Sequence, residues 1–119
     1  TDVDPSADVG CNEIFGPVAI VYSADGIDEA VRIANEESEY GLSSSVWSSD
    51  VDKAHEVAKR LKDGMTFVNE HAVTSAGLPF GGVGRSGYGR ELARWGVGEF
   101  VNDKLIRVSD QEDAGMSPG

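Results

Sequence analysis

The amino-acid sequence predicts an α/β fold in which crossover helices join the strands of a parallel sheet and cover it, giving three layers. Two observations lead to this prediction. Short apolar runs rich in β-branched residues alternate with segments whose apolar residues recur at helical spacing. The order is strand, helix, strand, helix, strand, and each connection is long enough to hold the helix that parallel strands require. The 119 residues amount to one domain.

The first strand is predicted over residues 17–23, PVAIVYS, as a buried strand that Asp25 and Gly26 bring to an end. A helix follows, because apolar residues then recur at helical spacing: Ile27, Ala30, Val31 and Ala34. Asp28 and Glu29 occupy its first turn, where the helix dipole favours acidic side chains.

The second unit repeats this order. Residues 42–48, LSSSVWS, are predicted as a strand, and Ser49 with Asp52 resembles a capping box at the start of a second helix. The apolar stripe of this helix consists of Val51, Ala54, Ala58 and Leu61. Gly64 suits the position just past the helix end, and residues 65–69, MTFVN, form the third strand.

The rest of the chain has a different character. Residues 70–88 form a long glycine-rich loop that contains Pro79, and loops of this length in compact domains are usually functional or disordered. A third helix is predicted over residues 89–101, followed by a short strand, KLIRV, at 104–108 and a polar end at 109–119 that is expected to fray. The residues of this helix that we expect to face the protein interior are Leu92, Trp95, Val97 and Phe100.

Acidic residues outnumber basic ones by 21 to 10, which gives a net charge of −11. This charge repels phosphate backbones and argues against nucleic-acid binding. No apolar run approaches the length of a membrane span, and the acidic first residues do not resemble a signal peptide. The charge is interpreted as a solvated surface. A surface adapted to high salt is the alternative, and the unfolding midpoint in molar salt distinguishes the two.

Cys11 is the only cysteine, so the chain can form neither an intrachain disulfide nor a cysteine-based metal site. This usage suits the cytoplasm. His55 and His71 lie far apart in the sequence without metal-ligand spacing around them, and we interpret both as ordinary surface or helix histidines.

Residues 82–87, GVGRSG, have the G-x-G-x-x-G spacing of a dinucleotide-binding loop. Such a loop requires a strand that runs directly into the first glycine and a helix whose N-terminus faces the phosphates. Here twelve residues, including Pro79, separate Asn69 at the end of the predicted strand from Gly82. We therefore interpret the segment as a tight turn, and a nucleotide site at 82–87 as an alternative function.

Three stretches together resemble NAD(P)-dependent aldehyde dehydrogenases. Residues 12–17, NEIFGP, are similar to the E-[IM]-F-G-P motif of that family, and residues 40–46, YGLSSSV, resemble its YGL strand entry. Residues 78–91, LPFGGVGRSGYGRE, resemble its late glycine-rich segment, with Gly84 where the family commonly has Lys. Their order and spacing agree over residues 1–108, nearly the whole chain.

The resemblance implies a C-terminal piece of a longer subunit. Residues 1–103 would be the end of the catalytic domain, and residues 104–119 an oligomerisation strand with a polar tail, through which homo-oligomers form. The family's catalytic cysteine lies upstream of E-[IM]-F-G-P, so Cys11 is on the wrong motif to be the nucleophile. The implied partners are the remainder of the subunit and an aldehyde substrate, and the piece is expected to be inactive alone. A stand-alone interaction module derived from this fold is the alternative.

The resemblance also implies roles for five residues. Glu13 matches a glutamate that binds the nicotinamide ribose hydroxyls, and Phe15 an aromatic beside the nicotinamide ring; from the residues alone they would be a solvent-facing acid and a core aromatic. Phe80 matches an aromatic that lines the aldehyde tunnel. The loop is similar to that of succinate-semialdehyde dehydrogenases, where a serine helps to hold the distal carboxylate; the matching position here is Thr74, with Ser75 adjacent.

The implied reaction oxidises an aldehyde to a carboxylic acid by thiolate attack, hydride transfer to the cofactor and thioester hydrolysis. The cofactor is NAD or NADP, and the sequence does not decide between them. Arg85 could add positive charge to the substrate pocket, but an arginine that faces outward is the simpler interpretation.

Overall fold

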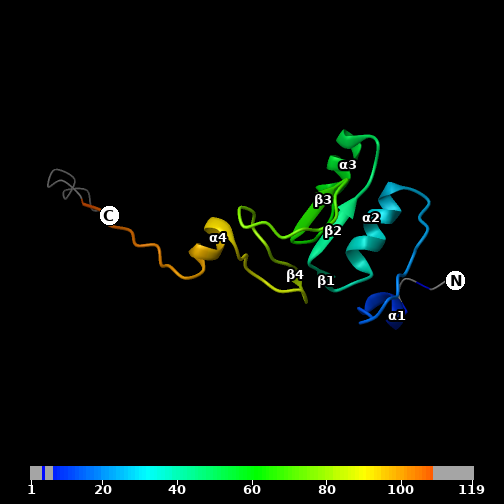
Figure 1. The fold of residues 1–119 in the computed structure, drawn as a ribbon, viewed down its shortest axis with the longest axis horizontal. Coiled ribbons are helices and arrows are strands. Elements are labelled where there is room, and N and C mark those ends of the chain that lie inside the picture. Colours follow the sequence, from blue (N-terminus) through cyan, green and yellow to red (C-terminus); the bar gives the residue numbers. More distant parts are fainter. Residues whose placement is uncertain (1–3, 5–6, 109–119) are drawn as a thin grey trace, which may run out of the picture.

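The computed structural model describes residue 4 and residues 7–108 (Figure 1). Short helices and strands are interspersed along the middle of the chain, and both ends of the described part are largely irregular. The helices are α1 (Asp8–Cys11), α2 (Ile27–Glu36), α3 (Val51–Ala58) and α4 (Ala93–Gly98). The strands are β1 (Tyr40–Gly41), β2 (Ser43–Val46), β3 (Met65–Val68) and β4 (Val83–Gly84).

Strands β2 and β3 form a parallel pair, in register from Ser43 opposite Met65 to Val46 opposite Val68. Helix α3 connects them and packs against both strands. This unit confirms the predicted combination of parallel strands and a crossover helix. The described residues contain only this one parallel pair, so the three-layer arrangement stays a prediction.

Helix α3 begins one residue later than the sequence indicated. The carboxylate Oδ1 of Asp50 accepts a hydrogen bond of 3.0 Å from the backbone N–H of Lys53, so Asp50 is the N-cap residue and the prediction of Ser49 was wrong. The aspartate lies directly before the first helical residue, where its carboxylate reaches a free N–H of the first turn. The helix ends at Ala58, too early for Gly64 to terminate it.

Helix α2 is tied by polar contacts to the segment that follows α3. The side-chain amide of Asn35 donates to the carbonyl of Arg60 at 2.8 Å and accepts from the N–H of Lys62 at 2.7 Å. Arg60 also forms an ion pair of 2.6 Å with Asp28. The two buried apolar side chains of the described residues are Val31 on α2 and Ala54 on α3.

A second, antiparallel pair joins β1 to β4 and was not predicted. Tyr40 lies opposite Gly84 and Gly41 opposite Val83. The N–H of Gly41 also donates to the hydroxyl of Ser86 at 3.0 Å. The glycine-rich segment is therefore not one continuous irregular loop, because its second half is fastened to β1.

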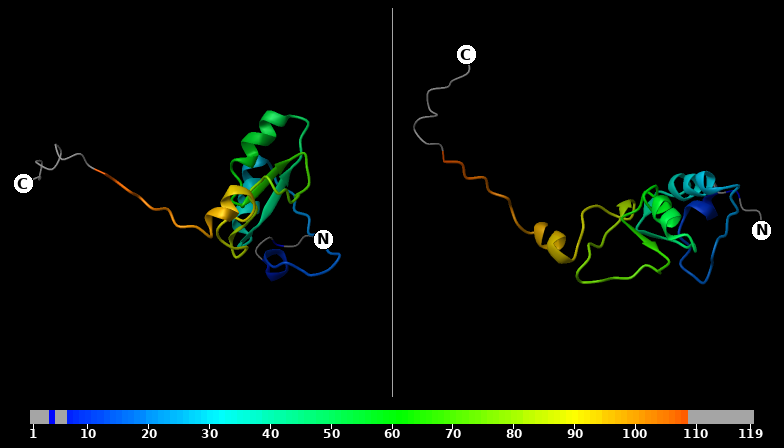
Figure 2. Two further views of the ribbon diagram at one scale, coloured as in Figure 1. Left: turned by 60° about the vertical axis from the view of Figure 1, so that its left-hand side comes forward. Right: turned by 90° about the horizontal axis from the view of Figure 1, so that it is seen from above.

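Two predicted strands are absent from the described residues. Residues 17–23 and 104–108 are irregular, and Val21 and Leu105 are each 88 % exposed. A strand exists only through hydrogen bonds to a neighbour, and no other described strand lies alongside either segment. Figure 2 shows residues 101–108 running away from the helices and strands. Residues 109–119 lie outside the described part.

Helix α4 is shorter than the predicted 89–101, and the prediction that Val97 and Phe100 face inward was wrong, because they are 65 % and 91 % exposed. The residue before the helix, Leu92, has a positive φ of 67°. Just before it, Glu91 pairs with Phe80 through two backbone hydrogen bonds. This pairing keeps the chain extended up to residue 91 and delays the start of the helix.

Among the described residues, no helix combines the length and apolar character needed to span a bilayer.

Candidate functional site

Two of the predicted substrate residues share a hollow of about 200 Å³ beside β3. Ser75 and Phe80 both line it, together with Val73, Leu78 and the residues of the strand. Thr74 does not line this hollow, although it neighbours Ser75 in the sequence. Of the two neighbouring hydroxyl-bearing residues, Ser75 and not Thr74 therefore borders this space.

The backbone around Phe80 is fixed by two sets of hydrogen bonds. Its N–H donates to the carbonyl of Glu91 at 2.9 Å, and the N–H of Glu91 donates to the carbonyl of Phe80 at 2.8 Å. The guanidinium Nη1 of Arg90 donates to the carbonyl oxygens of Gly82 at 2.9 Å and of Gly89 at 2.6 Å. These contacts close residues 80–91 into a loop with the aromatic side chain at its base.

The predicted cofactor residues lie elsewhere. Glu13 lines a larger hollow of about 430 Å³, which also touches Tyr40, Ser44 and Lys62. Phe15 lies outside that hollow and is 94 % exposed. The described residues therefore do not bring Glu13 and Phe15 together with Ser75 and Phe80 in one pocket.

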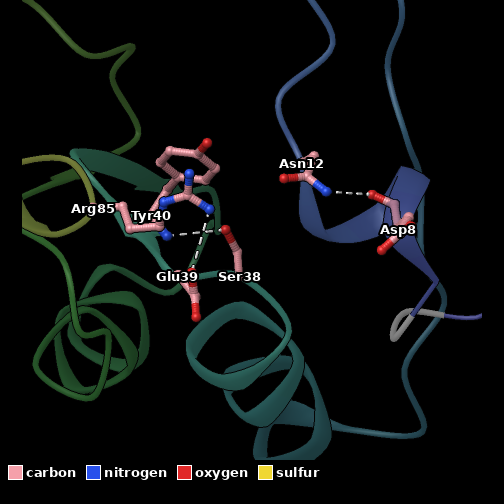
Figure 3. Close-up of polar contacts among 6 residues, drawn as sticks. All are labelled: Asp8, Asn12, Ser38, Glu39, Tyr40 and Arg85. Atoms are coloured by element: carbon pink, nitrogen blue, oxygen red, sulfur yellow. Dashed lines mark hydrogen bonds and ion pairs between the residues drawn. The ribbon is translucent and has the colours of Figure 1, made fainter.

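The residue types and exposure of Glu13 and Phe15 fit a nicotinamide nucleotide. The Glu13 carboxylate forms no hydrogen bond or ion pair with any described residue, so it is free to accept hydrogen bonds from a ribose diol. The Phe15 ring offers an uncovered apolar face. Just before them, the side chain of Asn12 donates to the carbonyl of Asp8 at 3.0 Å, which closes the end of α1 (Figure 3).

Arg85 faces a different surface from the hollow that contains Ser75. Its Nη1 lies 3.4 Å from Oε2 of Glu39, and its Cζ lies 5.2 Å from the centre of the Tyr40 ring (Figure 3). Its side chain is more than half exposed. The arrangement agrees with the interpretation of an arginine that faces outward.

The GVGRSG segment forms strand β4 followed by a turn, in which the N–H groups of Ser86 and Gly87 donate to the carbonyls of Val83 and Gly84. The next helix begins only at Ala93, so its N-terminus does not face this turn in the manner of a dinucleotide loop. Gly84 has a φ of 60°, and a Cβ there would collide with the carbonyl oxygen of Glu39. Close pairing with β1 therefore explains this glycine.

Within the described part of the chain, no three His, Cys, Asp or Glu side chains gather as metal ligands would. His55 is exposed on α3. His71 is also exposed, and its ring lies 5.1 Å from that of Trp47. Cys11 is the last residue of α1 and is partly buried.

Asn69 is a residue whose part in the structure the sequence analysis missed. Its Oδ1 accepts from the backbone N–H of Ser48 at 2.8 Å, and its Nδ2 donates to the carbonyl of Ser48, also at 2.8 Å. Its φ is 54°. The signal that could have revealed it is an asparagine directly after an apolar strand, since asparagine tolerates the left-handed conformation better than most residues.

Comparison with known proteins places these features in a family. A family model described as "Aldehyde dehydrogenase family" matches residues 1–106. The chain belongs to the aldehyde dehydrogenase family. This confirms the resemblance found in the three sequence motifs.

The most similar curated aldehyde dehydrogenases include two that are named succinate-semialdehyde dehydrogenase [NADP(+)]. The protein from Deinococcus radiodurans is 52 % identical over 108 residues, which is 91 % of this chain and 22 % of the relative. The protein from Mycobacterium ulcerans is 44 % identical over 108 residues, 91 % of this chain and 23 % of the relative. The chain thus spans less than a quarter of the length of these two relatives.

Solved aldehyde dehydrogenase structures share the fold. The succinic semialdehyde dehydrogenase of Streptococcus pyogenes, solved with NADP+, has a TM-score of 0.80 and 42 % identity over 84 % of this chain and 22 % of its own. The aldehyde dehydrogenase of Mycobacterium tuberculosis, solved with NAD+, has a TM-score of 0.78 and 40 % identity over 83 % of this chain and 20 % of its own. These similarities support the predicted α/β fold of the family.

Proposed function

We propose that this chain is the C-terminal part of an aldehyde dehydrogenase subunit that oxidises succinate semialdehyde to succinate with NAD or NADP as cofactor. The observation that carries the substrate proposal is the shared hollow of Ser75 and Phe80. It combines the Ser75 hydroxyl with apolar walls from Val73 and Leu78, whereas the Thr66 hydroxyl in the same lining already donates to Asp63. The similarity to succinate-semialdehyde dehydrogenases supports the same substrate class.

The hollow suits a short aldehyde that carries a carboxylate at its far end. The Ser75 hydroxyl can donate a hydrogen bond to that carboxylate, and hydrogen bonds to an ionised acceptor are stronger than neutral ones. Phe80 and its apolar neighbours would pack against the carbon chain between the two polar ends. In this proposal the chain positions the substrate, and the nucleophilic thiol comes from the remainder of the subunit.

The cofactor would be held by Glu13 and Phe15. The free carboxylate would accept hydrogen bonds from the nicotinamide ribose, and the exposed ring would border the nicotinamide. When bound, the cofactor supplies the hydride acceptor for the oxidation. The names of the relatives favour NADP+, while the solved relatives include complexes with both nucleotides.

The distribution of apolar side chains supports a part of a larger subunit rather than a stand-alone module. Only Val31 and Ala54 are buried apolar residues in the described part of the chain, whereas Val21, Phe100 and Leu105 are almost fully exposed. Large exposed apolar surfaces usually mark contacts with other protein segments. The remainder of the subunit would cover these side chains.

Steady-state kinetics of the complete subunit test the substrate proposal. With either nicotinamide nucleotide, we expect kcat/KM for succinate semialdehyde to exceed that for butyraldehyde, which lacks the carboxylate, by about tenfold or more. Ser75→Ala should reduce this ratio, and Ser23→Ala, an exposed serine in the segment after Phe15, should leave it unchanged. Equal kcat/KM values for the two aldehydes in the unmodified enzyme would contradict the proposal.

We also propose that residues 104–108 mediate homo-oligomerisation. The segment is exposed along its whole length, and its unpaired backbone can add a strand to the sheet edge of another subunit. Deleting residues 104–119 from the complete subunit should lower the oligomeric state measured by light scattering. An unchanged state after the deletion would show that the assembly rests on other surfaces.

A further inference from the structure

The side chain of Asn69 continues the contact between β2 and β3 beyond the last strand residue. Its backbone N–H donates to the carbonyl of Val46 at 2.9 Å, and this bond extends the main-chain pairing of β2 and β3 by one residue. The backbone then turns into the left-handed region at φ 54° and leaves the sheet. The carboxamide supplies the donor and the acceptor that a further strand residue would offer, and both bond to the backbone of Ser48 at 2.8 Å.

This arrangement determines where the substrate loop begins. The loop, defined here as residues 70–79, follows Asn69 directly, and residues 70–78 are all exposed. A second contact lies beside the first, because the ring of His71 is 5.1 Å from the ring of Trp47, next to Ser48 in the sequence. The next hydrogen bond within the loop runs from the N–H of Leu78 to the carbonyl of Ser75 and closes a turn.

We propose that Asn69 is a positioning residue that sets the specificity of the enzyme for a carboxylate-bearing aldehyde by fixing the start of the substrate loop. This inference rests on the proposed function, in which Ser75 receives the distal carboxylate. Asn69 does not line the hollow, so it acts through the path of the backbone between itself and Ser75. A loop without this anchor would present the Ser75 hydroxyl in several positions, and the hydrogen bond to the carboxylate would weaken.

Asn69→Gly is the decisive variant, because glycine adopts a positive φ freely and lacks the two side-chain hydrogen bonds. Ser48→Ala is the control, since it retains the backbone atoms of Ser48 to which Asn69 bonds and removes only the hydroxyl, which accepts from the N–H of Asp50 at 3.1 Å. In the complete subunit, we expect Asn69→Gly to lower the ratio of kcat/KM for succinate semialdehyde over butyraldehyde about tenfold, mainly through KM. Asn69→Asp keeps the acceptor but loses the donor, and should fall in between. Ser48→Ala should keep the ratio.

Hydrogen exchange of the backbone amides of residues 70–78 gives a readout that does not depend on the substrate. Exchange should be faster in Asn69→Gly than in the unmodified subunit or in Ser48→Ala. Unchanged exchange would overturn the anchoring role, and faster exchange with an unchanged kcat/KM ratio would overturn the specificity role. If the unmodified enzyme does not oxidise succinate semialdehyde, the proposed function fails and the specificity role of Asn69 fails with it, whereas the exchange result still decides the anchoring role.

Discussion

Replacement of Gly64 by alanine is expected to destabilise the fold by about 3 kcal/mol or more, because neither of the two touching segments can give way. Gly64 directly precedes β3, and its Cα faces the backbone of the glycine-rich loop. A Cβ on it would collide with the carbonyl oxygen of Gly81 and lie 2.8 Å from the Cα of Gly82. These atoms belong to the backbone, so rotating a side chain cannot relieve the clash.

The collision would also reach the substrate hollow, since Gly81 follows Phe80 directly and Gly64 itself lines that hollow. The thermal unfolding midpoint of the complete subunit measures the effect. Gly77→Ala is the matched control, because a Cβ on Gly77 meets no atom within 4 Å. We expect that control to unfold at or slightly above the midpoint of the unmodified protein. Equal midpoints for the two variants would show that the loop can move away from β3 at little cost.

Replacement of Glu13 by glutamine is expected to reduce kcat/KM for the nicotinamide nucleotide by about tenfold to a hundredfold. The change retains the shape of the side chain but removes the charge that strengthens hydrogen bonds from the ribose hydroxyls, and such bonds contribute about 1.5–3 kcal/mol. The KM for the aldehyde should change little, because Glu13 and Ser75 line separate hollows. Steady-state kinetics with the nucleotide as the varied substrate provide the measurement.

The large negative charge of the chain requires a control for this experiment. Any lost carboxylate makes the protein less repulsive to an anionic nucleotide, whatever its position. Asp52→Asn removes one charge from the first turn of α3, outside the described hollows that contain Glu13 and Ser75. We expect this variant to bind the nucleotide as well as the unmodified enzyme or slightly better. If Glu13→Gln behaved in the same way, Glu13 would have no direct contact with the ribose.

The parts of the fold that the sequence predicted are those determined by local patterns. Helix α2 and the unit of β2, α3 and β3 follow from apolar spacing and acidic first turns, and they appear close to the expected residues. Residues 17–23 and 104–108 carry equally good strand patterns, yet neither is paired in the described chain. A strand pattern indicates the side chains that suit a sheet, but the neighbour that makes the strand lies elsewhere.

The site was predictable to the extent that motifs identify residue types. The sequence pointed to Thr74, Ser75 and Phe80, and the structure brings Ser75 and Phe80, but not Thr74, to one hollow. It could not reveal the pairing of β1 with β4 or the hydrogen bond from the N–H of Gly41 to the hydroxyl of Ser86, since both join segments far apart in the chain. The position of Asn69 after an apolar strand indicated its left-handed backbone, but not its partner, the backbone of Ser48, which lies 21 residues away in the chain.

The pairing of β1 with β4 has a consequence for the order in which the molecule assembles. Strands β2 and β3 pair Ser43 with Met65, whereas β1 and β4 pair Tyr40 with Gly84, about twice as far along the chain. Closing the longer loop costs more chain entropy before any contact compensates for it. We therefore infer that the β2–α3–β3 unit folds first and that the glycine-rich loop docks on it afterwards. The wall formed by Phe80 would then be among the last features to form and the first to open, which pulsed hydrogen exchange during refolding would show.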